Sequence, residues 1–123
     1  MHINATHIEA DPDDGENFAL LFIKGDDGNY LSLTRGTSGE NDHGIGVEIS
    51  DQSRSAFDAI YHCVFSSSQL QLTLHAGKID GINGDEVVVS FSAPHLELEL
   101  AEAALRNIFR GRESLIDGLT TGL

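Results

Sequence analysis

Residues 18–35 read FALLFIKGDDGNYLSLTR, and this stretch decides the fold more than any other. Two apolar runs flank residues 25–29, whose Asp, Gly and Asn residues are typical of a tight chain reversal. The stretch therefore predicts a β-hairpin. Apolar side chains occupy both faces of the first run, from Phe18 to Ile23, which predicts a central strand covered on both sides.

Alternating apolar and polar residues predict further strands on either side of the hairpin. These strands span residues 3–9, 45–50, 59–65, 70–75 and 86–92, with turns at 11–15, 66–68 and 82–85. Between Leu98 and Ile108 the apolar residues recur at helical spacing instead. The helix start is left open, because residues 95–100 also alternate as a strand does. The order predicts an α+β fold, a mainly antiparallel β-sheet with one C-terminal α-helix packed on a face.

The length of 123 residues predicts a single domain covering 1–123. Residues 36–46 are rich in Gly, Ser, Asn and Asp, so they are the best candidate for a long mobile loop. Residues 113–123 follow the last helical residues and are expected to form a frayed tail.

Charge limits the partners that the chain can bind. The 20 acidic residues outnumber the 7 basic ones, which gives a formal net charge of −13. Nucleic acids and anionic membrane surfaces attract Lys and Arg patches, so neither is expected as a partner. A basic protein or a cation fits better, with solubility as the simpler explanation. Residues 1–60 hold 12 acids and 3 bases, and residues 61–123 hold 8 and 4, so the excess lies in the first half.

The sequence also bears on location and chemistry. The longest apolar stretch, residues 18–23, is too short to span a bilayer, and no signal peptide is visible. The lone Cys63 cannot form an internal disulfide, which fits a cytoplasmic protein. The histidines lack metal-ligand spacing, the acidic turns lack the EF-hand pattern, and no nucleophile elbow or phosphate loop occurs. We therefore expect no metal, no cofactor and no enzymatic activity, with a small hydrolase as a weak alternative.

One polar stretch stands out among the strands. Residues 48–60 read EISDQSRSAFDAI, and residues 50–55 are all polar between two apolar segments. Asp and Ser side chains bond nearby backbone amides and fix such a turn. An ordered turn that runs straight into the next strand is the simplest interpretation.

Several patterns in the same order carry a resemblance. A strand reads YLSLTR at residues 30–35, a Gly- and Asp-rich loop follows, and the polar stretch and a closing helix come next. In these patterns the chain resembles the immunity protein 10 family of bacterial polymorphic toxin systems. Where members of that family carry aromatic-Gly-Gly-Ile, this chain has Phe57-Asp58-Ala59-Ile60. The matching positions of the polar stretch and the helix are Glu48, Gln52, Ser53, Ser55, Phe57, Ile60, Leu105, Ile108 and Phe109.

The resemblance implies a small cytoplasmic protein that binds and neutralises a cognate toxin domain. An acidic inhibitor of a basic target, such as a nuclease, would associate quickly and in a salt-sensitive way. Solvated loops explain the acidic stretches equally well, and a structural module that self-associates through sheet edges is the alternative. The last three of the candidate contact residues rest on the resemblance. The candidates are Asp13, Asp14, Glu16, Asp26, Asp27, Glu40, Asp42, Glu48, Asp51 and Gln52.

Overall fold

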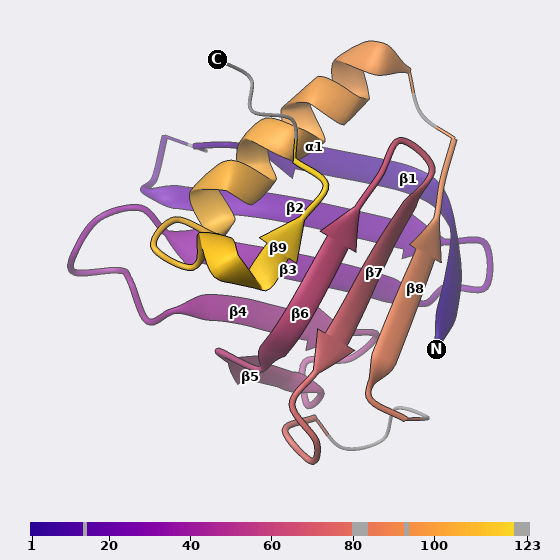
Figure 1. The fold of residues 1–123 in the computed structure, drawn as a ribbon, viewed down its shortest axis with the longest axis horizontal. Helices are drawn as coiled ribbons and strands as arrows, with labels where there is room; N and C mark the ends of the chain where they lie inside the picture. The colour runs from indigo at the N-terminus through magenta and orange to yellow at the C-terminus, as the bar shows by residue number, and fades with distance from the viewer. Residues whose placement is uncertain (14, 80–83, 93, 120–123) are drawn as a thin grey trace.

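The computed structural model describes residues 1–13, 15–79, 84–92 and 94–119, except the side chains of residues 95 and 96. Within these residues the chain forms a nine-stranded sheet, one α-helix and one short 3-10 helix (Figure 1). The predicted α+β class is confirmed. The elements are β1 (His2–Asp11), β2 (Phe18–Gly25), β3 (Tyr30–Gly36), β4 (Ile45–Ile49), β5 (Ser55–Phe57), β6 (Ile60–Phe65), β7 (Gln69–Leu74), β8 (Glu86–Ser90), α1 (His95–Ile108), η1 (Glu113–Leu115) and β9 (Ile116–Asp117).

Strand β1 joins two halves of the sheet. The strand order is β5-β4-β3-β2-β1-β8-β7-β6-β9, so β1 lies in the middle. Its residues 2–4 pair in parallel with β8, and its residues 5–11 pair antiparallel with β2. The register shifts between Ala5 and His7, and such irregularities bend and twist a strand. We call β1–β5 the first half-sheet and β1 with β6–β9 the second half-sheet.

The core lies between the two half-sheets and the helix. Helix α1 contacts β1, β2 and β3. In Figure 1, α1 and strands β6–β8 lie on the same side of the first half-sheet. The inward residues are almost fully buried, for example Leu21, Leu33 and Val89, and the helix adds Leu105 and Ile108. The apolar residues that recur at helical spacing between residues 98 and 108 thus form the face of α1 that packs on the core.

The prediction for β2 was half right. It is a central strand, because it pairs with β1 on one side and β3 on the other. Ala19, Leu21 and Ile23 are buried, but Phe18 on the opposite face is 40% exposed. The second layer packs on only one face of this half-sheet, so the other face is not covered as the sequence suggested.

The polar stretch at 50–55 does not run straight into an apolar strand. It turns into β5, which pairs antiparallel with β4. The chain then crosses to the second half-sheet and begins β6 at Ile60. Three residues are too few to show an alternating pattern, so the sequence did not predict this edge strand.

Arg35 fixes the end of the helix to the first half-sheet. Its side chain is only 5% exposed, and its Nη1 donates to the carbonyl oxygens of Ile108 (2.9 Å) and Arg110 (3.0 Å). The last carbonyls of a helix have no partner within the helix, and a cation there also complements the helix dipole. The guanidinium further donates from Nε (2.6 Å) and Nη2 (2.9 Å) to the two carboxylate oxygens of Asp42.

The loop between β3 and β4 is therefore attached to the core. It was predicted as a long mobile loop over residues 36–46, but Gly36 belongs to β3 and Ile45 and Gly46 belong to β4, so the loop spans residues 37–44. Besides the Arg35–Asp42 pair, Thr37 N donates to the Asn17 carbonyl (2.7 Å), and Gly44 N donates to Asp42 (3.0 Å). These bonds fix it at both ends.

The expected frayed tail was wrong for residues 113–119, and residues 120–123 lie outside the described part. Residues 113–115 form η1, and β9 then pairs in parallel with β6, with Ile116 opposite Cys63. The side chain of Ile116 is 8% exposed. A short strand that buries one apolar side chain leaves little periodicity in the sequence.

Gly118 ends this strand in a place that admits no side chain. Its φ is +95°, and a Cβ there would overlap the carbonyl oxygen of Phe65. We expect Gly118→Ala to lower the free energy of unfolding by about 1–3 kcal/mol more than Gly77→Ala, since forced overpacking adds to the backbone cost. Gly77 is the matched control, because its φ is +77° and a Cβ there would meet nothing within 4 Å. Equal losses in urea unfolding would show that the tail does not dock on β6.

Candidate binding surface on the outer face of the first half-sheet

The face of the first half-sheet that points away from α1 carries the candidate site, and we call it the outer face. Strand register places its side chains in rows that cross the strands. Neighbouring strands lie about 4.8 Å apart, so side chains in one row are close neighbours. One row, from β1 to β5, holds Glu9, Phe22, Ser32, Glu48 and Ser55. The next row holds Asp11, Leu20, Thr34, Gly46 and Phe57.

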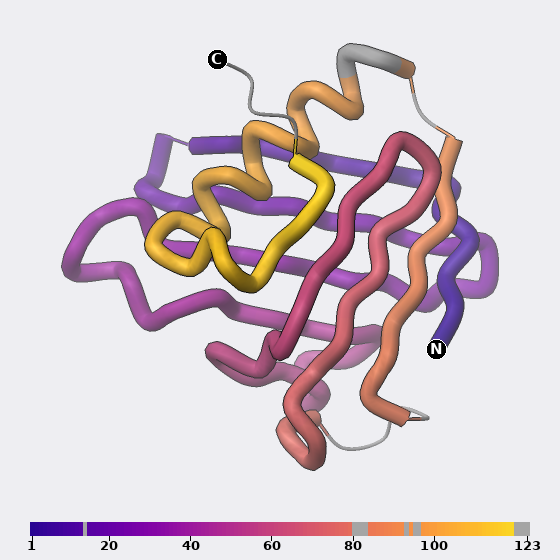
Figure 2. The backbone as a smooth tube through the Cα atoms, in the orientation of Figure 1, coloured from indigo at the N-terminus to yellow at the C-terminus, as the bar shows by residue number. Residues whose placement is uncertain are grey.

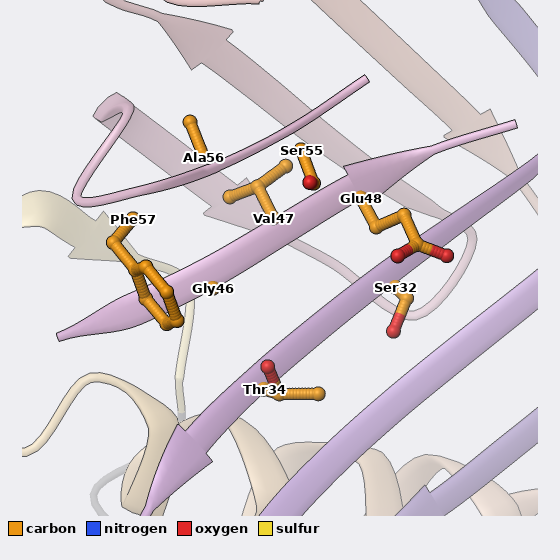
Figure 3. A pocket seen from close by; sticks show the side chains of 8 residues that line it. All are labelled: Ser32, Thr34, Gly46, Val47, Glu48, Ser55, Ala56 and Phe57. Carbon is orange, nitrogen blue, oxygen red and sulfur yellow. The ribbon is translucent and has the colours of Figure 1, made fainter. Parts of the chain in front are cut away.

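A groove of about 380 Å³ opens on this face over β3, β4 and β5 (Figure 3). The Phe57 ring stands at one end of it beside Gly46, and the Glu48 carboxylate stands at the other beside Ser32. None of the residues that line the groove is basic. They are Ser32, Thr34, Gly46, Val47, Glu48, Ser55, Ala56 and Phe57.

Gly46 forms the floor of the groove. It pairs with Phe57, and a Cβ at this glycine would lie 2.6 Å from Thr34 Oγ1 and 3.4 Å from Phe57 Cε1. An aromatic ring opposite a strand glycine restores the packing that the missing side chain would supply. The Phe57 side chain is nevertheless 57% exposed, and its other ring contact is with His43, at 5.9 Å between centroids.

A tyrosine holds Glu48 in place. The Tyr30 hydroxyl donates to Glu48 Oε2 at 2.6 Å, and the Tyr30 ring lies 5.5 Å from the ring of Phe22. A carboxylate can accept about four hydrogen bonds, so this one bond leaves acceptor capacity over the groove. The bond to the carboxylate also raises the pKa of Tyr30 to about 12, with burial as a smaller cause.

We expect Tyr30 to titrate near that value in a spectrophotometric titration of Tyr61→Phe, which leaves Tyr30 as the only tyrosine. The folded protein holds this proton more tightly than the unfolded chain, so the stabilisation is present below the ordinary pKa of 10.0 and is lost as the pH rises towards 12. Glu48→Gln removes the charge and should lower the pKa of Tyr30 towards its ordinary value. An unchanged value in Glu48→Gln would mean that the bond is absent.

Two turns meet at the end of the half-sheet next to Glu48. Ser50 Oγ donates to Asn29 Oδ1 (2.9 Å), and Ser50 N donates to the Tyr30 carbonyl (3.0 Å), so the β4–β5 turn is bonded to the β2–β3 turn. Ser50 has a φ of +62°, a strained value for a residue with a side chain. We call the exposed Asp and Gln residues of these turns together with Glu48 the acidic end: Asp26, Asp27, Glu48, Asp51 and Gln52.

Local hydrogen bonds keep two of these carboxylates ionised. The backbone amide of Asn29 lowers the pKa of Asp27, and the backbone amide of Ser53 lowers the pKa of Asp51. Both groups are exposed. The structure thus brings five of the ten predicted contact residues together, although 25 positions separate Asp26 from Asp51 in the sequence.

The other predicted residues lie elsewhere. Asp13, Glu16, Glu40 and Asp42 belong to the β1–β2 and β3–β4 connections, at the opposite end of the half-sheet (Figure 2). Asp14 lies outside the described residues. Asp42 pairs with Arg35, so its carboxylate has a structural role, and the guanidinium holds its pKa well below the usual range.

Asp58 stands where the resembling family carries the first of its two glycines. Its φ is +52°, in the left-handed region that favours glycine and that Asp tolerates better than most residues. Its Oδ1 accepts a bond from Ile45 N (3.1 Å) and pairs with Arg112 Nε (3.2 Å). The following residue, Ala59, is fully buried. The chain thus keeps a glycine-like backbone at residue 58 without the glycine.

Glu48 is the one groove residue that the sequence analysis selected as a contact, and Ser55 and Phe57 were named there only as positions of the resemblance. Ser32 and Thr34 alternate with buried leucines on β3, and that alternation already places them on one face. Gly46 and Phe57 become neighbours only through the β4–β5 register. A glycine within a strand is a signal of close approach, and it could have drawn attention to this spot.

Comparisons with known proteins add no relative. No family model matches the chain, and neither a curated protein nor a solved structure is significantly similar to it. Among the described residues, no three His, Cys, Asp or Glu side chains are grouped as a metal site needs. Cys63 is buried, which raises the pKa of its thiol to about 12. No described helix has the length and apolar character to cross a membrane.

Proposed function

We propose that this protein is an inhibitory binding module that neutralises a cognate bacterial toxin domain with a basic surface. The docking surface is the acidic end together with the groove beside it. This function rests on the resemblance of residues 48–60 to the immunity protein 10 family and on what those residues do in the fold. The proposed location is the cytoplasm, where such a toxin would act on its own producer.

One observation carries the proposal. The stretch that bears the resemblance supplies both the β4–β5 turn of the acidic end and the β5 wall of the groove. It therefore contributes ionised carboxylates, an exposed aromatic ring and a recess within one small area. Interfaces combine an aromatic anchor in such a recess with a polar rim.

Charge supports the choice of a basic partner. The net charge of −13 raises the rate at which a basic protein meets this one, and the fixed turns give the encounter a direction. Such association slows as salt is added, because exposed charges more than about 8 Å apart are screened at physiological ionic strength.

Self-association through sheet edges is the weaker alternative. The edge strands of the described sheet are β5, with three residues, and β9, with two. Very short edge strands are a device that natural sheets use against edge-to-edge pairing. The core of the described residues takes up Ala101, Ala104, Leu105 and Ile108 of α1, while Leu100 on the same helix is 49% exposed.

A survival assay tests the proposal. The toxin domain encoded next to this protein is expressed in a sensitive bacterium with and without it, and growth is scored. We expect growth to be restored by the wild-type protein and lost with a variant that combines Asp26→Lys, Glu48→Lys and Asp51→Lys. The control variant combines Asp85→Lys and Glu86→Lys, at the start of β8 in the second half-sheet. We expect this control to restore growth as the wild type does. Unchanged killing in the presence of folded wild-type protein would refute the immunity role.

A further inference from the structure

We propose that the groove over β3, β4 and β5 binds one arginine side chain of the partner, with the guanidinium on Glu48. This inference deepens the proposed function and rests on it for the identity of the partner. Three properties of the groove favour arginine: the negative charge of the groove, its hydrogen-bond acceptors and its aromatic wall.

The polar groups of the groove suit a guanidinium. Arginine carries five N–H donors and no acceptor, so a site for it must present several oxygen acceptors. Glu48 presents a carboxylate whose position the Tyr30 hydroxyl fixes at 2.6 Å. The hydroxyls of Ser32, Thr34 and Ser55 line the same recess. Planar, forked recognition of a carboxylate is the feature that separates arginine from lysine.

The apolar part of the groove suits the stem of the same side chain. Gly46 lets the Thr34 hydroxyl and the Phe57 ring lie close over the strand, and the exposed Phe57 ring forms the apolar wall. Phe57 pairs with Gly46, so its backbone lies two residues, about 7 Å along the strand direction, from the level of Glu48. Arginine packs its methylene groups on apolar surface while its head reaches a polar partner. A ring near the cation adds a favourable cation–π term.

Charge complementarity extends beyond the groove. None of the lining residues is basic, and the carboxylates of Asp26, Asp27 and Asp51 lie in the turns next to Glu48. Two cations lie nearby. Lys24 is on β2, two strands away from β4, and the half-buried Arg54 is in the β4–β5 turn, where its charge acts on Asp51. The carboxylates of Asp26, Asp27, Glu48 and Asp51 outnumber these two cations, so an arginine that enters the groove meets a net negative field.

The test uses small probes, so that it does not depend on the toxin. Amide resonances of the full chain are followed by NMR during titration with N-acetyl-arginine amide, N-acetyl-lysine amide and the neutral isostere N-acetyl-citrulline amide. We expect the arginine probe to shift resonances of residues 32–34, 46–48 and 55–57, with millimolar affinity. The citrulline and lysine probes should bind about tenfold more weakly, because the charged fork is lost or replaced. Equal binding of the three probes, or shifts centred elsewhere, would overturn the proposal.

Three variants sharpen the result. Glu48→Gln should abolish the preference for arginine over citrulline. Gly46→Ala should weaken arginine binding about tenfold, because the added Cβ would lie 2.6 Å from Thr34 Oγ1 and displace this hydroxyl from the groove. Glu9→Gln is the matched control, because Glu9 lies in the same row three strands away from Glu48. It should bind arginine as the wild type does. Wild-type behaviour of Glu48→Gln would contradict the proposal.

The two proposals fail in different ways. A protein that protects cells but does not discriminate arginine from citrulline would keep its immunity role and lose the arginine site. A protein that binds the arginine probe in the groove but does not protect cells would keep the site and lose the immunity role.

Discussion

Replacement of Arg35 by alanine is expected to lower the free energy of unfolding by about 2–4 kcal/mol, because it removes a buried donor from two backbone carbonyls and the cation from the partly exposed Asp42. The change leaves the carboxylate of Asp42 without its cation and the carbonyls of Ile108 and Arg110 without their donor. It therefore affects the β3–β4 loop and the helix end together. Urea unfolding followed by circular dichroism measures the loss.

Arg110→Ala is the matched control for this prediction. Arg110 follows the same helix end, but its side chain is exposed. We expect a loss within about 0.5 kcal/mol, as for most surface substitutions. A similar loss in the two variants would mean that the Arg35 side chain does not join the helix to the sheet.

Acid should weaken the same contact. Arg35 holds the pKa of Asp42 well below its ordinary value of 3.8, so the folded protein binds this proton more weakly than the unfolded chain does. The pair therefore stabilises the fold above that pH, and the stabilisation is lost as the pH falls below it. Asp42→Asn should make the unfolding free energy less dependent on pH in this range.

Under the proposed function, neutralising the acidic end should slow association with the toxin domain by about tenfold or more, the lower bound for electrostatic steering. The variant combines Asp26→Asn, Asp27→Asn and Asp51→Asn. Asp27 and Asp51 accept hydrogen bonds from backbone amides of their turns. Asparagine keeps a side-chain oxygen that can accept the same bonds, so the turns should keep their conformation. The association rate constant is measured by stopped flow at several salt concentrations. We expect the variant to lose most of the salt dependence.

The control removes the same charge elsewhere. It combines Asp85→Asn, Glu86→Gln and Glu40→Gln, and Glu40 lies at the opposite end of the first half-sheet. We expect a smaller change in association rate, since only the long-range field is reduced. Equal slowing of the two variants would show that net charge, rather than the acidic end, guides the encounter.

Periodicity explains which parts of the fold could be predicted. In the hairpin at 18–35, buried and more exposed residues alternate on both strands, with turn residues between them. The structure confirms the two strands as β2 and β3. The helix was recognised from apolar residues at helical spacing. Strands β5 and β9 are two or three residues long, so their pairing depends on distant partners and not on a local pattern. The prediction that both faces of β2 are covered was wrong, because Phe18 and Phe22 are apolar and yet lie on the outer face, on which no second layer of the described chain packs.

The candidate site could be predicted only residue by residue. Sequence reasoning selected Glu48, Asp51 and Gln52 on resemblance and Asp26 and Asp27 on charge, and it could not tell that the two turns meet. Their contact depends on the β3–β4 register and on the Ser50–Asn29 bond. Asp42 was selected on charge alone. In the structure it forms an ion pair with Arg35, because a buried guanidinium needs an anionic partner.

The most direct test of the proposed function is hydrogen–deuterium exchange of the protein alone and in complex with the toxin domain encoded beside it. We expect slower exchange on binding in residues 26–34 and 46–57, which hold the acidic end and the groove, and little change in β6–β8. Slower exchange confined to the second half-sheet or to α1, or no complex at all, would contradict the proposal.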